Sequence, residues 1–310
     1  MLTLPDFKEK QILFIRSKYC SEYKIKLWND NVLYLEDNHI INRTPISKLF
    51  SIFIIGPISI TSKIIKELRK NGVSLFFLDY NLKTYAKILA PAEGNYLLRE
   101  KQYTFKNNLD FSKNLIKNKI ENQCRLLEKQ TSKKYFLIIF KIQQAKNRQE
   151  LLGIEGNQSK NFFQQYFIDI NWKARLPRTK IDVPNLLLDI GYHYLFNFID
   201  TMLGLYGFDT YKGIYHQLFF QRRSLACDIM EPFRCIIDKA VVKNYNLKKI
   251  NNNDFIKKQN AYAIKNSYYE KYSLLFIQAI LEHKTEIYKY VKDFYYYIGK
   301  ETKMPNFKIK

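Results

Sequence analysis

The sequence is poor in cysteine, glycine and proline, and it is short of acidic residues. Only four cysteines occur in 310 residues, and none of them forms a C-x-x-C pair. This pattern argues against a zinc cluster built on cysteine and against a framework of disulfides. Sparse, scattered cysteine is typical of a protein that works in a reducing cytoplasm.

Long hydrophobic runs are also missing. The longest, LFSIFIIGPISI (49–60), contains Gly56 and Pro57, and a membrane-spanning helix needs about 20 consecutive apolar residues. The opening segment MLTLPDFKEK becomes charged at once, which is unlike a signal peptide. We therefore expect a cytoplasmic protein with no membrane partner.

Acidic residues are scarce relative to basic ones. The chain has 51 Lys and Arg residues against 29 Asp and Glu residues, a formal net charge of +22. An excess of this size favours polyanionic partners, either nucleic acid or an anionic membrane. An AT-rich genome also enriches lysine, but it does not explain the shortage of acids. Since 46% of the residues are hydrophobic, the chain can still bury a core.

The first 90 residues have the pattern of a small β domain. Short β-branched or aromatic segments separated by polar turns predict strands at KQILFIRS (10–17), KIKLWND (24–30), NVLYLED (31–37), SIFIIG (51–56) and VSLFFLD (73–79). One helix is predicted among them at TSKIIKELRKNG (61–72), because a Thr/Ser cap opens it and Gly72 closes it.

Beyond residue 98 the pattern becomes helical. Apolar residues recur at helical spacing over 109–129, 135–152, 159–170, 185–204, 225–244 and 268–297. We expect an α+β protein in which a β-rich N-terminal domain (1–90) is joined by a hinge (91–98) to an all-helical domain (99–310). Within the helical domain we expect the polar segment 248–260 to be mobile and the basic tail 299–310 to be poorly ordered.

Two acids occur inside the apolar stretch GIYHQLFFQRRSLACDIMEPFR (213–234). Asp228 and Glu231 are three residues apart and share a helical face, and His216 lies twelve residues before Asp228. Two half-buried carboxylates raise each other's pKa unless a cation lies between them. Carboxylates with one imidazole suit Mn²⁺ or Mg²⁺. Taken singly, such a pair is more often a solvated helix face, and a lone histidine beside aromatics is more often a core residue.

Glu155 is a candidate for a further ligand. It lies between Gly153 and Gly156, where glycines permit a tight turn and a following helix start favours negative charge. A simple turn is the commoner meaning of this pattern. Pro232 directly follows Glu231, so it either merely breaks the helix or bends it in a way that aims Glu231.

Three blocks, GIEGNQSKNFFQQYF (153–167), DVPNLLLDIGYHYL (182–195) and GIYHQLFFQRRSLACDIMEPFR, resemble in order the motifs of the Cas-one family. These are the CRISPR-associated spacer-acquisition integrases or endonucleases. The segments ITSKIIKELRKNGVSLFFLD and KNKIENQCRLL also look like family segments. The resemblance implies a β domain, a flexible connection and a helical catalytic domain.

The resemblance also implies a site for Mg²⁺ or Mn²⁺. Its metal ligands on this chain are Glu155, His216 and Glu231, while Asp228 has an auxiliary role through water or through hydrogen bonds to a ligand. The implied reaction is phosphoryl transfer, in which the 3′-hydroxyl of a captured DNA fragment attacks the backbone at the edge of a CRISPR repeat. The implied partners are double-stranded DNA, a second copy of the chain and a small Cas-two protein. We expect the β domain to carry the dimer surface.

Two basic clusters are candidates for DNA contacts, which would supply sequence-independent affinity. They are Arg222 and Arg223, between His216 and Asp228, and the loop residues Lys173, Arg175, Arg178 and Lys180. A basic run is more often a solvated face. Two other functions stay open: a metal-dependent nuclease acting on branched DNA or RNA, and a non-catalytic DNA-binding scaffold. The intact set of three ligands argues against the scaffold.

Overall fold

The computed structural model describes residues 10–17, 21–78, 84–90, 96–106, 108–131, 138–170, 172, 174–217, 219–300 and 302–310. The chain divides into two compact units. Unit 1 comprises Met1–Arg99 and Thr201–Phe208, and unit 2 comprises Glu100–Asp200 and Asp209–Lys310. Most of the expected hinge, 91–95, lies outside the described residues, and 96–98 begin helix α3 (Tyr96–Thr104).

Unit 1 is built on two sheets. The strands β1 (Gln11–Arg16), β5 (Leu49–Ile55), β6 (Ser74–Leu78) and β7 (Thr84–Ile88) form one sheet in that order. In it, β1, β5 and β6 run parallel, whereas β7 is antiparallel to β6. The second sheet is an antiparallel meander of β2 (Tyr23–Trp28), β3 (Asn31–Glu36) and β4 (His39–Pro45).

Local sequence explains these elements. The two tight turns of the meander contain Asn29-Asp30 and Asp37-Asn38, all with positive φ, a conformation that Asn and Asp tolerate well. Every residue of β5 is buried, as expected for a strand in the middle of a sheet that is covered on both faces. Helix α2 (Ser62–Lys70) begins after Thr61, whose hydroxyl accepts from the Ile64 amide, and it buries Ile64 and Leu68. The predicted strands and helix of this region are confirmed.

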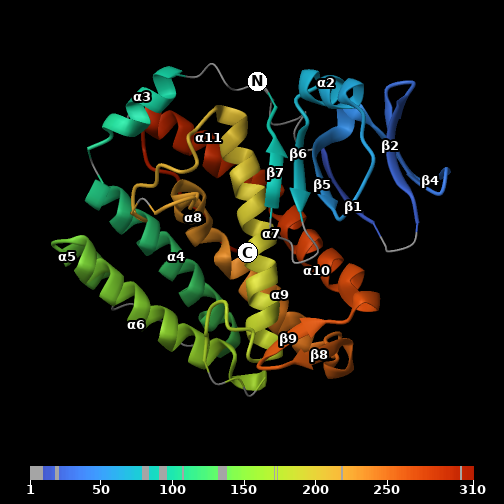
Figure 1. Ribbon diagram of the computed structural model, residues 1–310. Helices are drawn as coiled ribbons and strands as arrows, with labels where there is room; N and C mark the ends of the chain where they lie inside the picture. The colour runs from blue at the N-terminus through green and yellow to red at the C-terminus, as the bar shows by residue number, and fades with distance from the viewer. Residues whose placement is uncertain are drawn as a thin grey trace. The chain divides into compact units, whose positions relative to one another are not determined.

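Unit 2 is largely helical, so the predicted α+β class is confirmed (Figure 1). Its helices include α4 (Asn108–Thr131), α5 (Ile138–Gln144), α6 (Arg148–Tyr166), α7 (Val183–Tyr206), α8 (Ser224–Met230), α9 (Arg234–Asn246), α10 (Tyr269–Glu282) and α11 (Lys284–Lys300). The end of α7 belongs to unit 1. Helices α4 and α6 pack side by side (Figure 1). No helix in the described ranges is both long enough and apolar enough to cross a bilayer.

The predicted turn around Gly153 and Gly156 is wrong, because both glycines lie inside α6. The helix begins earlier, at Asn147, whose side chain accepts from the Glu150 amide at 2.9 Å and so caps the first turn. A methyl group at either glycine would meet no atom within 4 Å. The two glycines therefore leave open space on the flank of α6.

The segment expected to be mobile, 248–260, contains ordered structure, and the helical domain is not all-helical. Strands β8 (Phe255–Lys258) and β9 (Ala261–Ile264) pair as a hairpin. Buried Asp254 anchors its base, accepting from the Lys271 ammonium at 2.6 Å and from the Tyr272 hydroxyl at 2.8 Å. The segment is ordered because these contacts and the strand pairing hold it in place, although its polar composition suggested mobility.

The tail is also ordered over 302–310. The side chains of Phe307 and Ile309 are buried, and they alternate with exposed lysines. The amide of Phe307 donates to Asn118 Oδ1 and that of Ile309 to Asn122 Oδ1, both at 2.9 Å. Because Asn118 and Asn122 are one turn apart on α4, the tail lies along this helix as an extended strap.

Candidate active site

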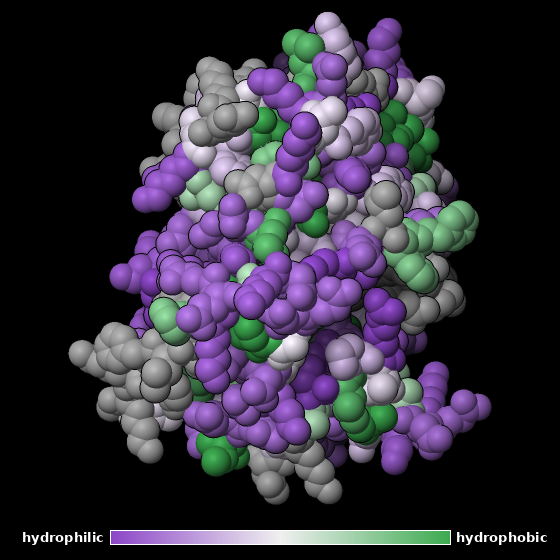
Figure 2. Space-filling model, turned by 90° about the vertical axis from the view of Figure 1, so that its left-hand side faces the viewer, coloured by the Kyte–Doolittle hydropathy of each residue, from purple (hydrophilic) through white to green (hydrophobic). Residues whose placement is uncertain are grey.

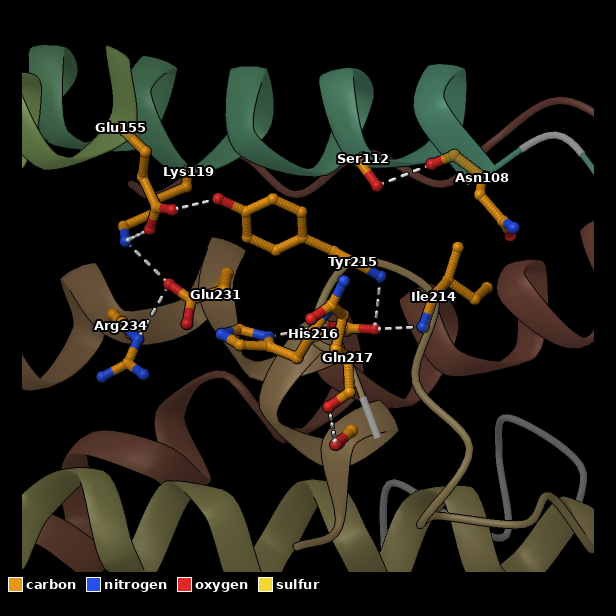
Figure 3. Close-up of polar contacts among 12 residues, drawn as sticks. Asn108, Ser112, Lys119, Glu155, Ile214, Tyr215, His216, Gln217, Glu231 and Arg234 are labelled. Atoms are coloured by element: carbon orange, nitrogen blue, oxygen red, sulfur yellow. Dashed lines mark hydrogen bonds and ion pairs between the residues drawn. The ribbon is translucent and has the colours of Figure 1, made fainter. Parts of the chain in front are cut away.

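Four segments of unit 2 bring the candidate residues together (Figure 3). Helix α6 carries Glu155, the loop before α8 carries His216, and the short 3-10 turn η3 (Glu231–Phe233) carries Glu231. Helix α4 adds Lys119, which the sequence analysis did not single out. Regular α-helix is interrupted at Pro232, since α8 ends at Met230 and α9 begins after the η3 turn, and this turn carries Glu231.

Asp228 fixes the loop that carries His216. Its Oδ2 accepts from the amides of Ile214 at 2.7 Å and Tyr215 at 3.0 Å, and its Oδ1 accepts from the amide of His216 at 2.9 Å. The same Oδ1 lies 2.6 Å from His216 Nδ1. Because the carboxylate already serves as acceptor for three amides, Nδ1 must be the donor, which leaves the lone pair of the imidazole on Nε2.

The same loop requires a glycine at position 213. A Cβ atom at Gly213 would lie 2.6 Å from the carbonyl oxygen of His216 and 2.6 Å from Ser224 Cβ, closer than a side chain tolerates. The hydroxyl of Ser224 also donates to the carbonyl of Gln217 at 3.1 Å. The loop is thus packed tightly against the start of α8, and the ring of His216 is held in one orientation.

Lys119 lies between two carboxylates. Its Nζ is 2.5 Å from Glu155 Oε1 and 2.8 Å from Glu231 Oε2. The lysine is 7% exposed and Glu231 is 2% exposed. Burial alone would lower the pKa of Lys119, but the two carboxylates outweigh it and raise the pKa above its ordinary value. The lysine therefore stays protonated between them.

Glu231 is held as an anion by several positive groups. Its Oε2 also accepts from Arg234 Nε at 2.9 Å. Burial alone would raise the pKa of Glu231, but Arg234 and Lys119 together hold it well below the usual range. The imidazole of His216 extends toward this carboxylate (Figure 3).

Tyr215 occupies the remaining oxygen of Glu155. Its hydroxyl donates to Glu155 Oε2, and its side chain is 1% exposed. The guanidinium of Arg148 lies 5.9 Å from the centre of the ring. Burial, together with the adjacent carboxylate, raises the pKa of Tyr215 far above its ordinary value, so the hydroxyl remains a donor. Both oxygens of Glu155 are therefore positioned by this chain's own groups.

Behind Glu231, a stack of side chains leads to a buried acid. The guanidiniums of Arg234 and Arg175 lie 4.7 and 5.4 Å from the ring centre of Tyr192. The hydroxyl of Tyr192 donates to Asp238, which is fully buried. Burial raises the pKa of Asp238 to about 7, although Tyr192 and the two arginines oppose this effect.

Asp238→Asn should flatten the pH dependence of stability. Between its ordinary pKa of 3.8 and about 7, folded Asp238 holds a proton that the unfolded chain releases, so stability falls as pH rises through this window. Asparagine still accepts the tyrosine hydrogen bond and has no proton to lose. Wild type should lose on the order of 2–4 kcal/mol between about pH 4.5 and pH 8 from this group, and the variant should not. Urea unfolding at both pH values measures the difference, and parallel curves would contradict the prediction.

The donor set fits a divalent cation. Carboxylates from two different elements converge on one positive charge, the Lys119 ammonium, and the His216 ring offers Nε2 beside them. In the described part of the chain, no three His, Cys, Asp or Glu side chains are close enough together to hold a metal as they stand. The oxygen and imidazole donors are those that a divalent ion prefers, and the two carboxylates already share one cation.

The predicted DNA contacts differ in their surroundings. Arg175 is paired with Asp189 at 2.6 Å, and Arg223 with Asp200 at 3.2 Å, so both guanidiniums already hold carboxylates inside unit 2. Among the others, Arg178 is exposed, Lys180 and Arg222 are half-buried, and Lys173 lies outside the described residues. Arg178 and Arg222 are thus better placed than Arg175 and Arg223 to meet a phosphate.

Sequence reasoning missed three residues of the site: Lys119, Tyr215 and Arg234. Arg234 follows Glu231 by three residues, and this spacing was a usable signal. Tyr215 sits beside His216 and could have been suspected from that position alone. Lys119 has no local signal beyond its place in KNKIENQCRLL, because its role arises from packing of α4 against α6.

Comparisons with known proteins agree with this fold. Residues 20–277 match the family model described as CRISPR associated protein Cas1. Over 268 residues the chain is 30% identical to a CRISPR-associated endonuclease Cas1 of Thermodesulfovibrio yellowstonii, covering 78% of this chain and 83% of that protein.

Among solved structures, the fold is similar to a Cas1 protein from Thermotoga maritima, with TM-score 0.80, 16% identity, and coverage of 96% of this chain and 100% of that one. It is also similar to a casposase bound to an integration product, with TM-score 0.79, 20% identity, and coverage of 96% and 92%. A third neighbour comes from a Cas6-RT-Cas1–Cas2 complex, with TM-score 0.76, 21% identity, and coverage of 95% and 35%. The chain therefore belongs to the CRISPR-associated Cas1 family, the Cas-one family of the sequence analysis.

Proposed function

We propose that this protein is a metal-dependent DNA integrase and endonuclease of CRISPR spacer acquisition. The convergence of Glu155 and Glu231 on one buried cation position, with His216 Nε2 beside them, carries the proposal. A relative named as an endonuclease and a fold neighbour solved with an integration product support it.

The chain's own residues would prepare the reaction. Mg²⁺ or Mn²⁺ held by Glu155, His216 and Glu231 would act as a Lewis acid toward the scissile phosphate. Asp228 keeps the lone pair of His216 on Nε2, and Tyr215 fixes the carboxylate of Glu155.

The proposed joining step exchanges one bond for another. The 3′-hydroxyl oxygen of the fragment would form a bond to the scissile phosphorus at the repeat's edge. The bond between that phosphorus and the 3′-oxygen of the target strand would break. The attacking hydroxyl loses its proton, and the leaving oxygen gains one. Since one phosphodiester replaces another, no nucleotide energy source is needed. With water as nucleophile, the same site would cut DNA.

DNA is held in this proposal by charge and by stacking. Arg178 and Arg222 would meet phosphates, adding salt-dependent affinity to the +22 net charge. Phe219 and Phe220, 74% and 83% exposed between His216 and Arg222, would stack on unpaired bases at a fragment's end. The side on which α5 and α6 lie is largely hydrophilic, with isolated hydrophobic spots (Figure 2).

The proposed assembly contains two copies of this chain and a small Cas2 protein. A fold neighbour comes from a Cas6-RT-Cas1–Cas2 complex, which supports the second partner. Trp28, Ile40 and Ile41, more than half exposed on β2 and β4 of unit 1, are candidate dimer contacts.

An integration assay tests the function. Purified protein, with and without Cas2, is mixed with a labelled duplex and a supercoiled plasmid carrying the repeat array. Joining is expected with Mn²⁺ or Mg²⁺, and not with a chelator or with a duplex that ends in dideoxynucleotides. Metal-dependent cutting without joining would instead indicate a nuclease acting on branched DNA or RNA. DNA binding with neither reaction would indicate a scaffold.

A further inference from the structure

Lys119 is an unusual lysine, because its charge is buried. Its side chain is 9% exposed, and its ammonium lies between the two carboxylates of the candidate metal site. A buried ammonium is stable only when it is paired, and Lys119 has both carboxylates as partners. A residue that served only to tie α4 to its neighbours would need just one of them.

The geometry around the ammonium resembles a cation site more than a simple ion pair. The two carboxylates come from α6 and η3, and each offers one oxygen, at 2.5 and 2.8 Å. Magnesium–oxygen distances are about 2.1 Å. The two carboxylate oxygens would therefore need to move closer by about 0.4 and 0.7 Å to hold a metal where Nζ now lies.

One position cannot hold two cations. An ammonium and a divalent ion at bonding distance from the same two oxygens would repel each other strongly, in surroundings with little water to screen them. Binding of the divalent ion must therefore expel the ammonium. Conversely, without the ion, the ammonium keeps Glu155 and Glu231 together although both are negative.

We propose that Lys119 is the counter-cation of the metal-free site: its ammonium holds the place of the divalent ion between Glu155 and Glu231 and leaves when the ion binds. This proposal rests on the proposed function, because it takes these carboxylates as metal ligands. It makes metal binding a competition. Lys119 preserves the shape of the site and at the same time weakens its affinity for the ion.

Two neutral variants test the competition. In Lys119→Met and Lys119→Gln, the carboxylates lose their resident cation, so Mn²⁺ should bind about tenfold tighter or more, measured by calorimetry or by the electron-spin signal of free Mn²⁺. Glutamine keeps a hydrogen-bond donor and protects the fold. Lys117→Met is the matched control, since Lys117 lies on the same helix and pairs with Glu121 at 3.9 Å. Its Mn²⁺ affinity should equal that of wild type.

The wild-type protein provides an independent measurement. Amine labelling followed by mass spectrometry should modify Lys119 slowly without metal and faster once Mn²⁺ is added, while labelling of Lys117 stays constant. Unchanged labelling, or Mn²⁺ affinity that is equal or weaker in both Lys119 variants, would overturn the proposal. If wild type binds Mn²⁺ and joins DNA, such a result rejects only the role of Lys119. If wild type and both variants fail to bind Mn²⁺, the proposed metal site fails with it.

Discussion

Glu231→Gln should lower the rate of DNA joining on the order of a thousandfold or more, while duplex affinity changes little. Glutamine has nearly the shape of glutamate, so packing around this buried side chain is kept. In the variant, the two positive side chains Lys119 and Arg234 have lost the carboxylate that they share, and only Glu155 still balances their charge. A further cation is then repelled where wild type would attract it. Single-turnover joining of a labelled duplex measures the rate, and fluorescence anisotropy measures binding.

The matched control is Glu121→Gln. Glu121 lies on α4 and is paired with Lys117, so it loses the same charge without touching the candidate site. Its joining rate should remain within about twofold of wild type, as expected for a long, partly exposed ion pair outside the site. Joining by Glu231→Gln at a rate near that of the control would show that Glu231 is not a ligand.

Asp228→Asn should be nearly as damaging, by about a hundredfold to a thousandfold, although Asp228 is not itself a proposed ligand. An asparagine amide presents a donor where the carboxylate presents only acceptors. Facing His216, that donor would move the ring proton to Nε2 and remove the lone pair proposed to bind metal. The variant should therefore bind Mn²⁺ about tenfold to a hundredfold more weakly as well as join DNA more slowly.

Asp254→Asn separates this effect from a general loss of stability. Asp254 is equally a buried acid of unit 2, with Lys271 and Tyr272 as partners at the β8–β9 hairpin. It should lower thermal stability but leave Mn²⁺ affinity unchanged. If Asp228→Asn lowered only stability, and its Mn²⁺ affinity matched that of Asp254→Asn, the role assigned to Asp228 would be rejected.

The sequence predicted the fold well wherever short-range patterns, such as alternation in a strand or a helix cap, decide the local structure. The alternating strands, the Thr61 cap and the long apolar period of α4 all appear as expected. The pattern failed around Gly153 and Gly156, where glycines suggested a turn but packing against α4 keeps α6 continuous. It also failed at Phe307 and Ile309, whose two-residue alternation is too short to recognise without the helix they cover.

The candidate site was only partly visible in the sequence. Glu231 and His216 both lie in the stretch 213–234, where acids and a histidine within an apolar sequence indicate a candidate site. Glu155 was selected for the wrong local reason, since it lies in a helix rather than a turn. Lys119 could not be derived at all, because a lysine in a chain with 51 basic residues has no individual signal. The role of Lys119 becomes visible only in the folded structure, where α4, α6 and η3 meet.

The strap along α4 bears on the order in which parts of unit 2 can fold during synthesis. Asn118 and Asn122 flank Lys119 on α4, yet their backbone partners are Phe307 and Ile309, separated from them by 189 and 187 positions. Contacts of such long range form late, and a growing chain folds from its N-terminal side. Until Phe307 and Ile309 have been made, the side chain of Asn118 lacks its contacts with Phe307, while Asn122 keeps those with Pro232 and Arg125. A ribosome-bound chain that already contains Glu155, His216 and Glu231 should thus still have a loosely held α4. We expect α4 to be held firmly only after residues 307–309 have been made and have packed along it.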